Sequence, residues 1–243
     1  MADVVDDSEL PKNTTASSAS TPTPTPTRDN DTAKLAGDEP PSAEIQAKVA
    51  SYTVLDREGQ PHQYSTLYSG PDAAPRTLVV FIRHFFCGSC KEYIEVLSKA
   101  ITPEFLSQLS TPTSVVVVGC GGPGLIDIYA KETGCQFPIY ADPTRKLYEQ
   151  LGLLSSLALG EKPEYIQKSM VQIVAESFWK TLKQLPSGLA LKGGDSRQNG
   201  GEFLYETSPE GGKEKRVAWC HRMQNTRDHT EVAALAKVLE RKG

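Results

Sequence analysis

The sequence predicts an α/β fold in which a mixed sheet is covered by helices on both faces. Two continuous apolar runs, Thr77–Ile82 and Ser114–Val118, have the length of buried strands. Helical patterns lie between the apolar runs, so these strands should be parallel with right-handed crossovers. A hairpin pattern near the end of the chain adds antiparallel strands, which makes the predicted sheet mixed.

Composition divides the 243 residues into a tail and one domain. Residues 1–45 contain 5 Ser, 7 Thr and 6 Pro, with nine acidic and three basic side chains. Such a segment cannot build a core, so we predict a disordered acidic tail; phosphorylation of Thr21–Thr27 is the functional alternative. Residues 46–243 should form a single domain. This part is nearly neutral, which disfavours nucleic acid as a partner.

The first residues and the cysteines suggest a compartment. The start of the chain has neither the basic residues nor the apolar core of a secretory signal, and no apolar run approaches the roughly 18 residues of a membrane span. Five cysteines in such a chain do not indicate a disulfide scaffold. We therefore expect reduced thiols, a cytosolic (or nuclear) location and no membrane partner.

The domain should begin with a short helical lead, Glu44–Ala50, and a small hairpin. Tyr52–Leu55 and Gln63–Leu67 are its predicted strands, because the residues between them are rich in turn formers. After the first apolar run comes a helix whose inner face repeats at spacings of three and four. That face comprises Tyr93, Ile94, Leu97 and Ile101.

The second apolar run leads to a glycine-rich turn, Gly119–Gly124, and a helix that stops near Gly134. Phe137–Tyr140 reads as a third strand. The next helix should end at Gly152. The inner face of this helix comprises Leu147, Tyr148 and Leu151.

Residues from about 155 to 199 are predicted to be a helical insertion. Its apolar residues keep helical spacing, which favours a covering helix over a groove for a partner or lipid. These residues are Ile166, Met170, Ile173, Val174, Phe178 and Leu182. The hairpin strands follow at Gly201–Thr207 and Arg216–His221, and a last helix packs Val232, Leu235, Ala236 and Leu239.

Cys87 and Cys90 form the strongest chemical signal. They follow a central strand and open a helix, where free backbone N–H groups and the helix dipole stabilise a thiolate. Cys87 near the N-cap suits a nucleophile, and Cys90, one turn further, suits a resolving thiol in thiol–disulfide exchange. Arg83 and Lys91 would add positive charge.

Two other interpretations of this pair remain. The thiols could be inert core residues, or they could be half of a zinc site. Zinc needs two more ligands, but Cys120, Cys135 and Cys220 form no second close pair and His84 lies at the strand end. We therefore expect no metal and no cofactor, with those three cysteines as ordinary thiols.

Gly119–Gly124 also satisfies the pattern G-x-G-x-x-G after a strand and before a helix. Asp142, about 20 residues further on, occupies the place of the acidic residue in a dinucleotide-binding unit. The turn nevertheless follows the second strand, and the chain lacks a second set of βα units. A plain glycine-rich turn is the preferred interpretation, and dinucleotide binding is the alternative.

Four motifs together resemble the AhpC/TSA antioxidant enzyme domain family, the peroxiredoxin-like 2 group, over about residues 50–240. They are Arg83–Tyr93, Tyr140–Tyr148, Gln198–Gly201 and His221–His229. The resemblance implies a thioredoxin-like fold with Cys87 and Cys90 as the redox-active pair. Where typical peroxiredoxins have a Pro and a Thr before the reactive Cys, this chain has Val80 and His84.

The first functional hypothesis is a thiol–disulfide oxidoreductase or peroxidase-like antioxidant protein. Its substrate would be a peroxide or a disulfide, and its reductant a thioredoxin or glutathione system. His84 is an auxiliary candidate as a proton acceptor for Cys90. Arg222, or Arg227, could approach the Cys87 thiolate. The alternatives are a dinucleotide-binding protein and a regulatory protein without turnover.

Overall fold

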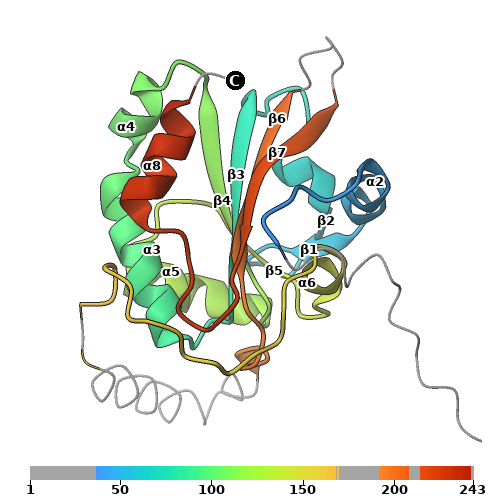
Figure 1. Ribbon diagram of the computed structural model, residues 1–243. Coiled ribbons are helices and arrows are strands. Elements are labelled where there is room, and N and C mark those ends of the chain that lie inside the picture. The colour runs from blue at the N-terminus through green and yellow to red at the C-terminus, as the bar shows by residue number, and fades with distance from the viewer. Residues whose placement is uncertain (1–36, 168, 170–191, 208–213, 242–243) are drawn as a thin grey trace, which may run out of the picture.

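The computed structural model describes residues 37–167, 169, 192–207 and 214–241, which form a seven-stranded sheet between two layers of helices (Figure 1). The strand order is β2-β1-β5-β4-β3-β6-β7. The strands are β1 (Thr53–Leu55), β2 (Pro61–Gln63), β3 (Arg76–Ile82), β4 (Thr113–Gly119), β5 (Ile139–Ala141), β6 (Gly201–Thr207) and β7 (Lys215–Arg222). The helices are α2 (Ala43–Ala50), α3 (Gly88–Ala100), α4 (Pro103–Gln108), α5 (Ile126–Thr133), α6 (Lys146–Gln150) and α8 (Val232–Glu240).

The topology is thioredoxin-like. Strand β3 pairs in parallel with β4, and β4 pairs in parallel with β5. On the other side of β3, β6 pairs antiparallel, and β7 continues the sheet antiparallel to β6. Helix α3 connects the parallel pair and α8 follows the last strand. The predicted fold class, a mixed sheet with helices on both faces and an N-terminal hairpin, is confirmed.

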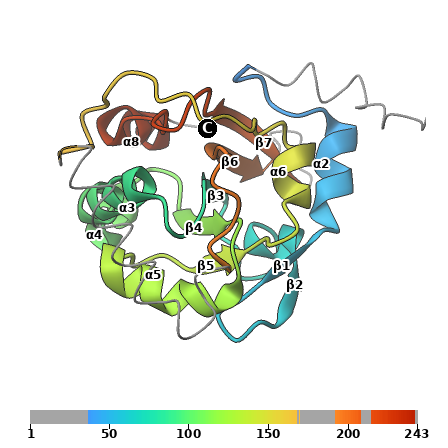
Figure 2. The same cartoon turned by 90° about the horizontal axis from the view of Figure 1, so that it is seen from below.

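Strand β3 reads as one continuous apolar run because both of its faces are covered. All seven of its residues are buried. Val80 and Ile82 point into the core beneath α3, α5 and α8, whereas Val79 and Phe81 point into the core beneath α2 and α6. Figure 2 shows these two groups of helices on opposite sides of the strands. The end of β3 therefore delivers the chain to a fixed place between the two cores.

The predicted hairpin forms, but its second strand was placed wrongly. The strand is Pro61–Gln63, and Tyr64–Leu67 is a 3₁₀ helix. Tyr64 and Leu67 are both buried. Three residues per turn bring both side chains to the same side, which an alternating strand would not do. Strand β5 likewise begins at Ile139, two residues later than predicted.

The described part of the chain begins before the predicted domain boundary. Residues 37–42 lie against β7, where the Asp38 carboxylate accepts a hydrogen bond from the Arg222 backbone N–H at 3.0 Å. Residues 1–36 of the predicted tail lie outside the described residues. The turn expected between the two late hairpin strands, at 209–212, and Met170 to Leu182 of the predicted insertion helix also lie outside the described residues. Ile166 of that predicted helix is buried in the core beneath α3. No helix among the described residues is long and apolar enough to cross a membrane.

Gly200 must be glycine because its backbone touches β3. A Cβ at this position would lie 1.9 Å from the Phe81 carbonyl oxygen, which is held in the sheet. We expect Gly200→Ala to lower the free energy of unfolding by about 3 kcal/mol, measured by chemical denaturation. Gly134→Ala is the control, since its Cβ would meet open space and only the positive φ is strained. That variant should lose about 1 kcal/mol; an equal loss in both would contradict the steric explanation.

Candidate active site

Cys87 is the N-cap of α3, as the sequence predicts. Its Sγ accepts a hydrogen bond from the backbone N–H of Cys90 at 3.4 Å. The residue is 4% exposed, and Cys90 is completely buried. The sulfur of Cys87 therefore sits at the positive end of a 13-residue helix, just beneath the surface.

Arg83 provides a fixed positive charge at this sulfur. Its Nη1 donates to Cys87 Sγ at 3.3 Å. The rest of the guanidinium is held by the chain that precedes β6, since Nε donates to the Gln198 carbonyl at 3.1 Å and Nη2 donates to the Ser196 carbonyl. Hydrogen bonds from three of its nitrogen atoms hold the guanidinium in place, so its charge stays beside Cys87.

Two further groups surround the sulfur pair. The Ser89 hydroxyl lies 3.2 Å from Cys87 Sγ and also donates to the Thr226 carbonyl at 3.1 Å. Cys90 Sγ accepts from the Arg83 backbone N–H at 3.4 Å. Among the described residues, the Arg83 guanidinium donates to Cys87 Sγ, whereas Cys90 Sγ receives only the Arg83 backbone N–H.

The two thiols ionise very differently. Burial opposes ionisation of Cys87, but the hydrogen bond from Cys90, the charges of His84 and Arg83 and the Ser89 hydroxyl together hold its pKa well below the ordinary value. Burial raises the pKa of Cys90 well above the ordinary value, and the neighbouring Cys87 adds to this. When the pair loses a proton, the charge therefore resides on Cys87 and Cys90 stays a thiol.

His84 and Lys91 take different places around the pair. Burial lowers the pKa of His84, so its charge favours the Cys87 thiolate only at pH values below the range of an ordinary imidazole, and Arg83 is the cation that persists near neutral pH. Lys91 is turned away from the sulfur, because its Nζ contacts Glu132 at 2.5 Å and lies 5.9 Å above the Phe86 ring centroid. The structure thus brings Arg83 and His84 to Cys87 and engages the charge of Lys91 elsewhere.

Arg222 does not lie at the site, which corrects its inclusion among the auxiliary candidates. Its guanidinium donates to the carbonyls of Leu151, Gly37 and Glu39 and lies over the Phe203 ring. Phe203 belongs to the core beneath α2 and α6, on the sheet face opposite Cys87. Three carbonyl groups from two separate segments hold Arg222 there, so its role is to fasten the N-terminal residues to β7.

The remaining cysteines resemble ordinary thiols. Burial raises the pKa of Cys120 to about 12 and that of Cys220 to about 11, and it also raises the pKa of Cys135. Cys120 Sγ donates to the Arg83 carbonyl at 2.9 Å. Within the described ranges, no group of three or more His, Cys, Asp or Glu side chains is placed to hold a metal ion.

The glycine turn after β4 is filled by the protein itself. A Cβ on Gly121 would lie 2.6 Å from the Phe85 ring and 2.7 Å from the Gly193 carbonyl oxygen. The Gly122 N–H donates to the Lys192 carbonyl at 2.7 Å. The glycines therefore allow residues 192–193 and Phe85 to pack closely, and the N–H group that a phosphate would use is already occupied.

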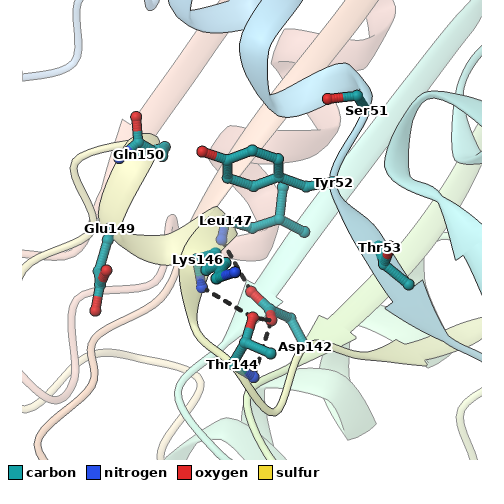
Figure 3. Close-up of a pocket in the computed structure, with 9 residues that line it drawn as sticks. All are labelled: Ser51, Tyr52, Thr53, Asp142, Thr144, Lys146, Leu147, Glu149 and Gln150. Atoms are coloured by element: carbon teal, nitrogen blue, oxygen red, sulfur yellow. Dashed lines mark hydrogen bonds between the residues drawn. The ribbon is translucent and has the colours of Figure 1, made fainter.

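Asp142, the other half of the dinucleotide pattern, is also occupied. Figure 3 shows its carboxylate bonded to Thr144 and to the backbone of Leu147, beneath Tyr52 in a cavity of about 650 Å³. The Leu147 N–H donates to it at 2.9 Å and the Thr144 hydroxyl at 2.6 Å. The Asp142 carboxylate is fully buried and organises the start of α6. This structural role explains the acidic residue at this position without a bound ribose.

The motifs Gln198–Gly201 and His221–His229 were visible in the sequence, but their contacts with the site were not. Ser196 and Gln198 hold Arg83, and Thr226 contacts Ser89, although each lies more than 100 residues from its partner. A second buried pair joins His229 Nδ1 to Glu202 Oε1 at 2.6 Å. The His229 ring stacks on the Tyr93 ring of α3, 4.2 Å between centroids, which fixes the loop before α8 against the helix that carries the cysteines.

Known proteins resemble the chain as follows. The family model described as AhpC/TSA antioxidant enzyme matches residues 97–225. Proteins named Peroxiredoxin-like 2C are 29% identical over 197 residues in Homo sapiens and 28% identical over 198 residues in Mus musculus, each covering 80% of both chains. Peroxiredoxin Q of Xanthomonas campestris matches as a solved structure with 11% identity, a TM-score of 0.47, and 80% of this chain and 90% of its own covered.

Arg83 should set the reactivity of Cys87. With Arg83→Met, the thiolate loses its guanidinium partner, and we expect the pH midpoint of Cys87 alkylation to move up towards that of an ordinary thiol. Iodoacetamide labelling followed by mass spectrometry measures this midpoint for Cys87 alone. Arg222→Met is the matched control and should leave the midpoint in place; an unmoved midpoint in Arg83→Met would show that the guanidinium does not stabilise the thiolate.

Because Phe85 and residues 192–193 pack into the glycine turn at 119–124, we predict that this turn binds no dinucleotide. We expect 1 mM NAD or NADP, about a typical saturating concentration, to leave the melting temperature unchanged, since a ligand that binds the native state must raise it. Differential scanning fluorimetry measures this shift. A saturable increase that disappears in Gly121→Ala would restore the dinucleotide interpretation.

Proposed function

The chain belongs to the AhpC/TSA antioxidant enzyme family, and from this premise we propose that it is a thiol peroxidase that uses Cys87 as nucleophile and Cys90 as resolving thiol. One observation carries the proposal: the pKa values of the two thiols, three residues apart, are shifted in opposite directions, and Arg83 donates to the sulfur with the lowered pKa. A stable thiolate beside a protonated thiol is what a nucleophile and its resolving partner require.

In the first step the Cys87 thiolate attacks the terminal oxygen of a hydroperoxide. The S–O bond forms as the O–O bond breaks, Cys87 becomes a sulfenic acid, and the leaving alkoxide or hydroxide takes up a proton. Arg83 donates to the sulfur at 3.3 Å, so its charge is close enough to stabilise the oxygen that becomes negative. Val80 and His84 replace the usual Pro and Thr, and Arg83 supplies a charged donor to the sulfur.

In the second step Cys90 attacks the oxidised sulfur. The Cys87–Cys90 disulfide forms and hydroxide leaves as water, with the proton of the Cys90 thiol balancing the charge. Two equivalents of an external thiol, or one dithiol, then reduce the disulfide. A reducing compartment such as the cytosol belongs to this proposal because the cycle consumes such a reductant. Reaction of Cys87 with a disulfide in place of the peroxide is the alternative first step.

A stopped-flow experiment distinguishes the two first steps. Hydrogen peroxide should oxidise reduced protein at a rate far above that of a free thiol, and mass spectrometry should find one Cys87–Cys90 disulfide that dithiothreitol reverses. Cys87→Ser should abolish the reaction. Cys90→Ser should keep the first step and stop at the sulfenic acid, which dimedone traps. A peroxide rate equal to that of a free thiol, beside rapid exchange with a protein disulfide, would replace the peroxidase by the oxidoreductase.

A further inference from the structure

Ser89 lies between the reactive sulfur and a loop on the far side of α3. Its hydroxyl is 3.2 Å from Cys87 Sγ and 3.1 Å from the Thr226 carbonyl oxygen. Ser89 and Thr226 are both buried, at 8% and 6% exposure, so bulk water does not readily replace either contact. The loop, residues 223–230, connects β7 to α8.

The hydrogen bonds among Cys87 Sγ, Ser89 Oγ and the Thr226 carbonyl oxygen cannot be the same when Cys87 is a thiol and when it is a thiolate, because the number of available protons differs. The Thr226 carbonyl can only accept, and the Ser89 hydroxyl carries a single proton. When Cys87 is a thiol, its S–H can donate to Ser89 Oγ while Ser89 donates to Thr226. When Cys87 is a thiolate it can only accept, so the hydroxyl proton must serve either the sulfur or the carbonyl.

The Ser89 hydroxyl proton favours the charged acceptor, the Cys87 thiolate, over the neutral Thr226 carbonyl. Hydrogen bonds to ionised groups contribute about twice as much as neutral ones, and the thiolate is nearly buried. We propose that Ser89 is a positioning residue: its proton points to the Thr226 carbonyl while Cys87 is a thiol and turns to the Cys87 sulfur on ionisation, so that loop 223–230 responds to the state of the sulfur. The proton lost by Cys87 goes to solvent, and the proton of Ser89 stays on its own oxygen.

Thr226 is placed to pass this change into the chain around the site. Its N–H donates to the Ala158 carbonyl at 2.8 Å, so one residue joins the loop to the extended segment 154–160. Leu157 and Leu159 in that segment are 60% and 52% exposed. Release of the Thr226 carbonyl therefore removes one of the hydrogen bonds that fix the loop between α3 and this segment.

Other groups also act on the ionisation of Cys87, and none of them replaces Ser89. Arg83 and His84 come from the end of β3, and Cys90 from α3 itself. Tyr129 of α5 and Tyr165 also face the sulfur pair, but burial raises the pKa of both phenols, so they stay neutral. Within the described part of the chain, Arg83, Ser89 and Cys90 hydrogen-bond to Cys87 Sγ, and Ser89 also donates to the Thr226 carbonyl of loop 223–230.

The proposal rests on the proposed function in taking Cys87 to react as a thiolate, but its test measures ionisation and not turnover. The thiolate fraction of Cys87 is obtained from its ultraviolet absorbance across pH, with Cys87→Ser subtracted. Ser89→Ala should reduce this fraction about tenfold at a pH below the midpoint, equivalent to about 1.4 kcal/mol. Ser89→Thr, which keeps a hydroxyl, should stay close to the unsubstituted protein. Coincident titrations of Ser89→Ala and the unsubstituted protein would overturn the proposal.

A second measurement needs no substitution at Ser89. Amide hydrogen exchange across loop 223–230, corrected for the intrinsic pH dependence, should become about fivefold faster as Cys87 ionises, the effect of losing one neutral hydrogen bond. Cys87→Ser, which cannot ionise in this range, should show no such step. Equal protection on both sides of the Cys87 midpoint would overturn the coupling, even if the protein proved inactive towards every peroxide.

Discussion

The Arg83 guanidinium is enclosed by the protein, and the partner that balances its charge is the Cys87 sulfur. Its other two hydrogen bonds go to backbone carbonyls, which satisfy its N–H groups but carry no net charge. Opposite charges 3.3 Å apart attract by about 5 kcal/mol at an effective dielectric constant of 20. Part of this attraction offsets the cost of burying both groups, and the remainder favours the thiolate. The Arg83 guanidinium therefore acts twice: with Cys90 and His84 it lowers the pKa of Cys87, and it binds the chain before β6.

Local features of this site could be predicted from sequence because they depend on neighbouring residues. A buried strand followed by a helical pattern fixes the end of β3 and the start of α3, so Cys87 at the N-cap and Arg83 beside it follow within one turn of chain. The placement of Arg83 also depends on the Gln198 carbonyl, which lies beside Arg83 because β6 pairs with β3. The glycine pattern at 119–124 left dinucleotide binding open as an alternative for the same reason, since its local spacing says nothing about residues 192–193, which pack against the turn.

The alternation of side chains between the two faces of β7 explains why the prediction that Arg222 approaches Cys87 was wrong. Side chains two residues apart on β7 share a face, so Arg222 lies on the side of Cys220, in the core beneath α2 and α6. The position of Arg222 along the chain does not by itself determine which face of the sheet its side chain occupies. There it binds the carbonyls of residues 37 and 39, which explains why these residues pack against the domain ahead of the predicted boundary at 46. One long-range contact thus accounts for both departures.

Burial also limits what can reach the reactive sulfur. Cys87 is 4% exposed, with Arg83 on one side, Ser89 on another and the start of α3 behind it. A hydroperoxide needs only its terminal oxygen to approach the sulfur, whereas a protein disulfide must bring two sulfurs into line together with the backbone that carries them. Attack on a protein disulfide therefore requires displacement of the surrounding chain, and the segments that would have to move are those that hold Arg83 and Ser89. Movement of either segment would withdraw stabilisation from the thiolate just when it attacks, so this geometry favours a small oxidant in the first step.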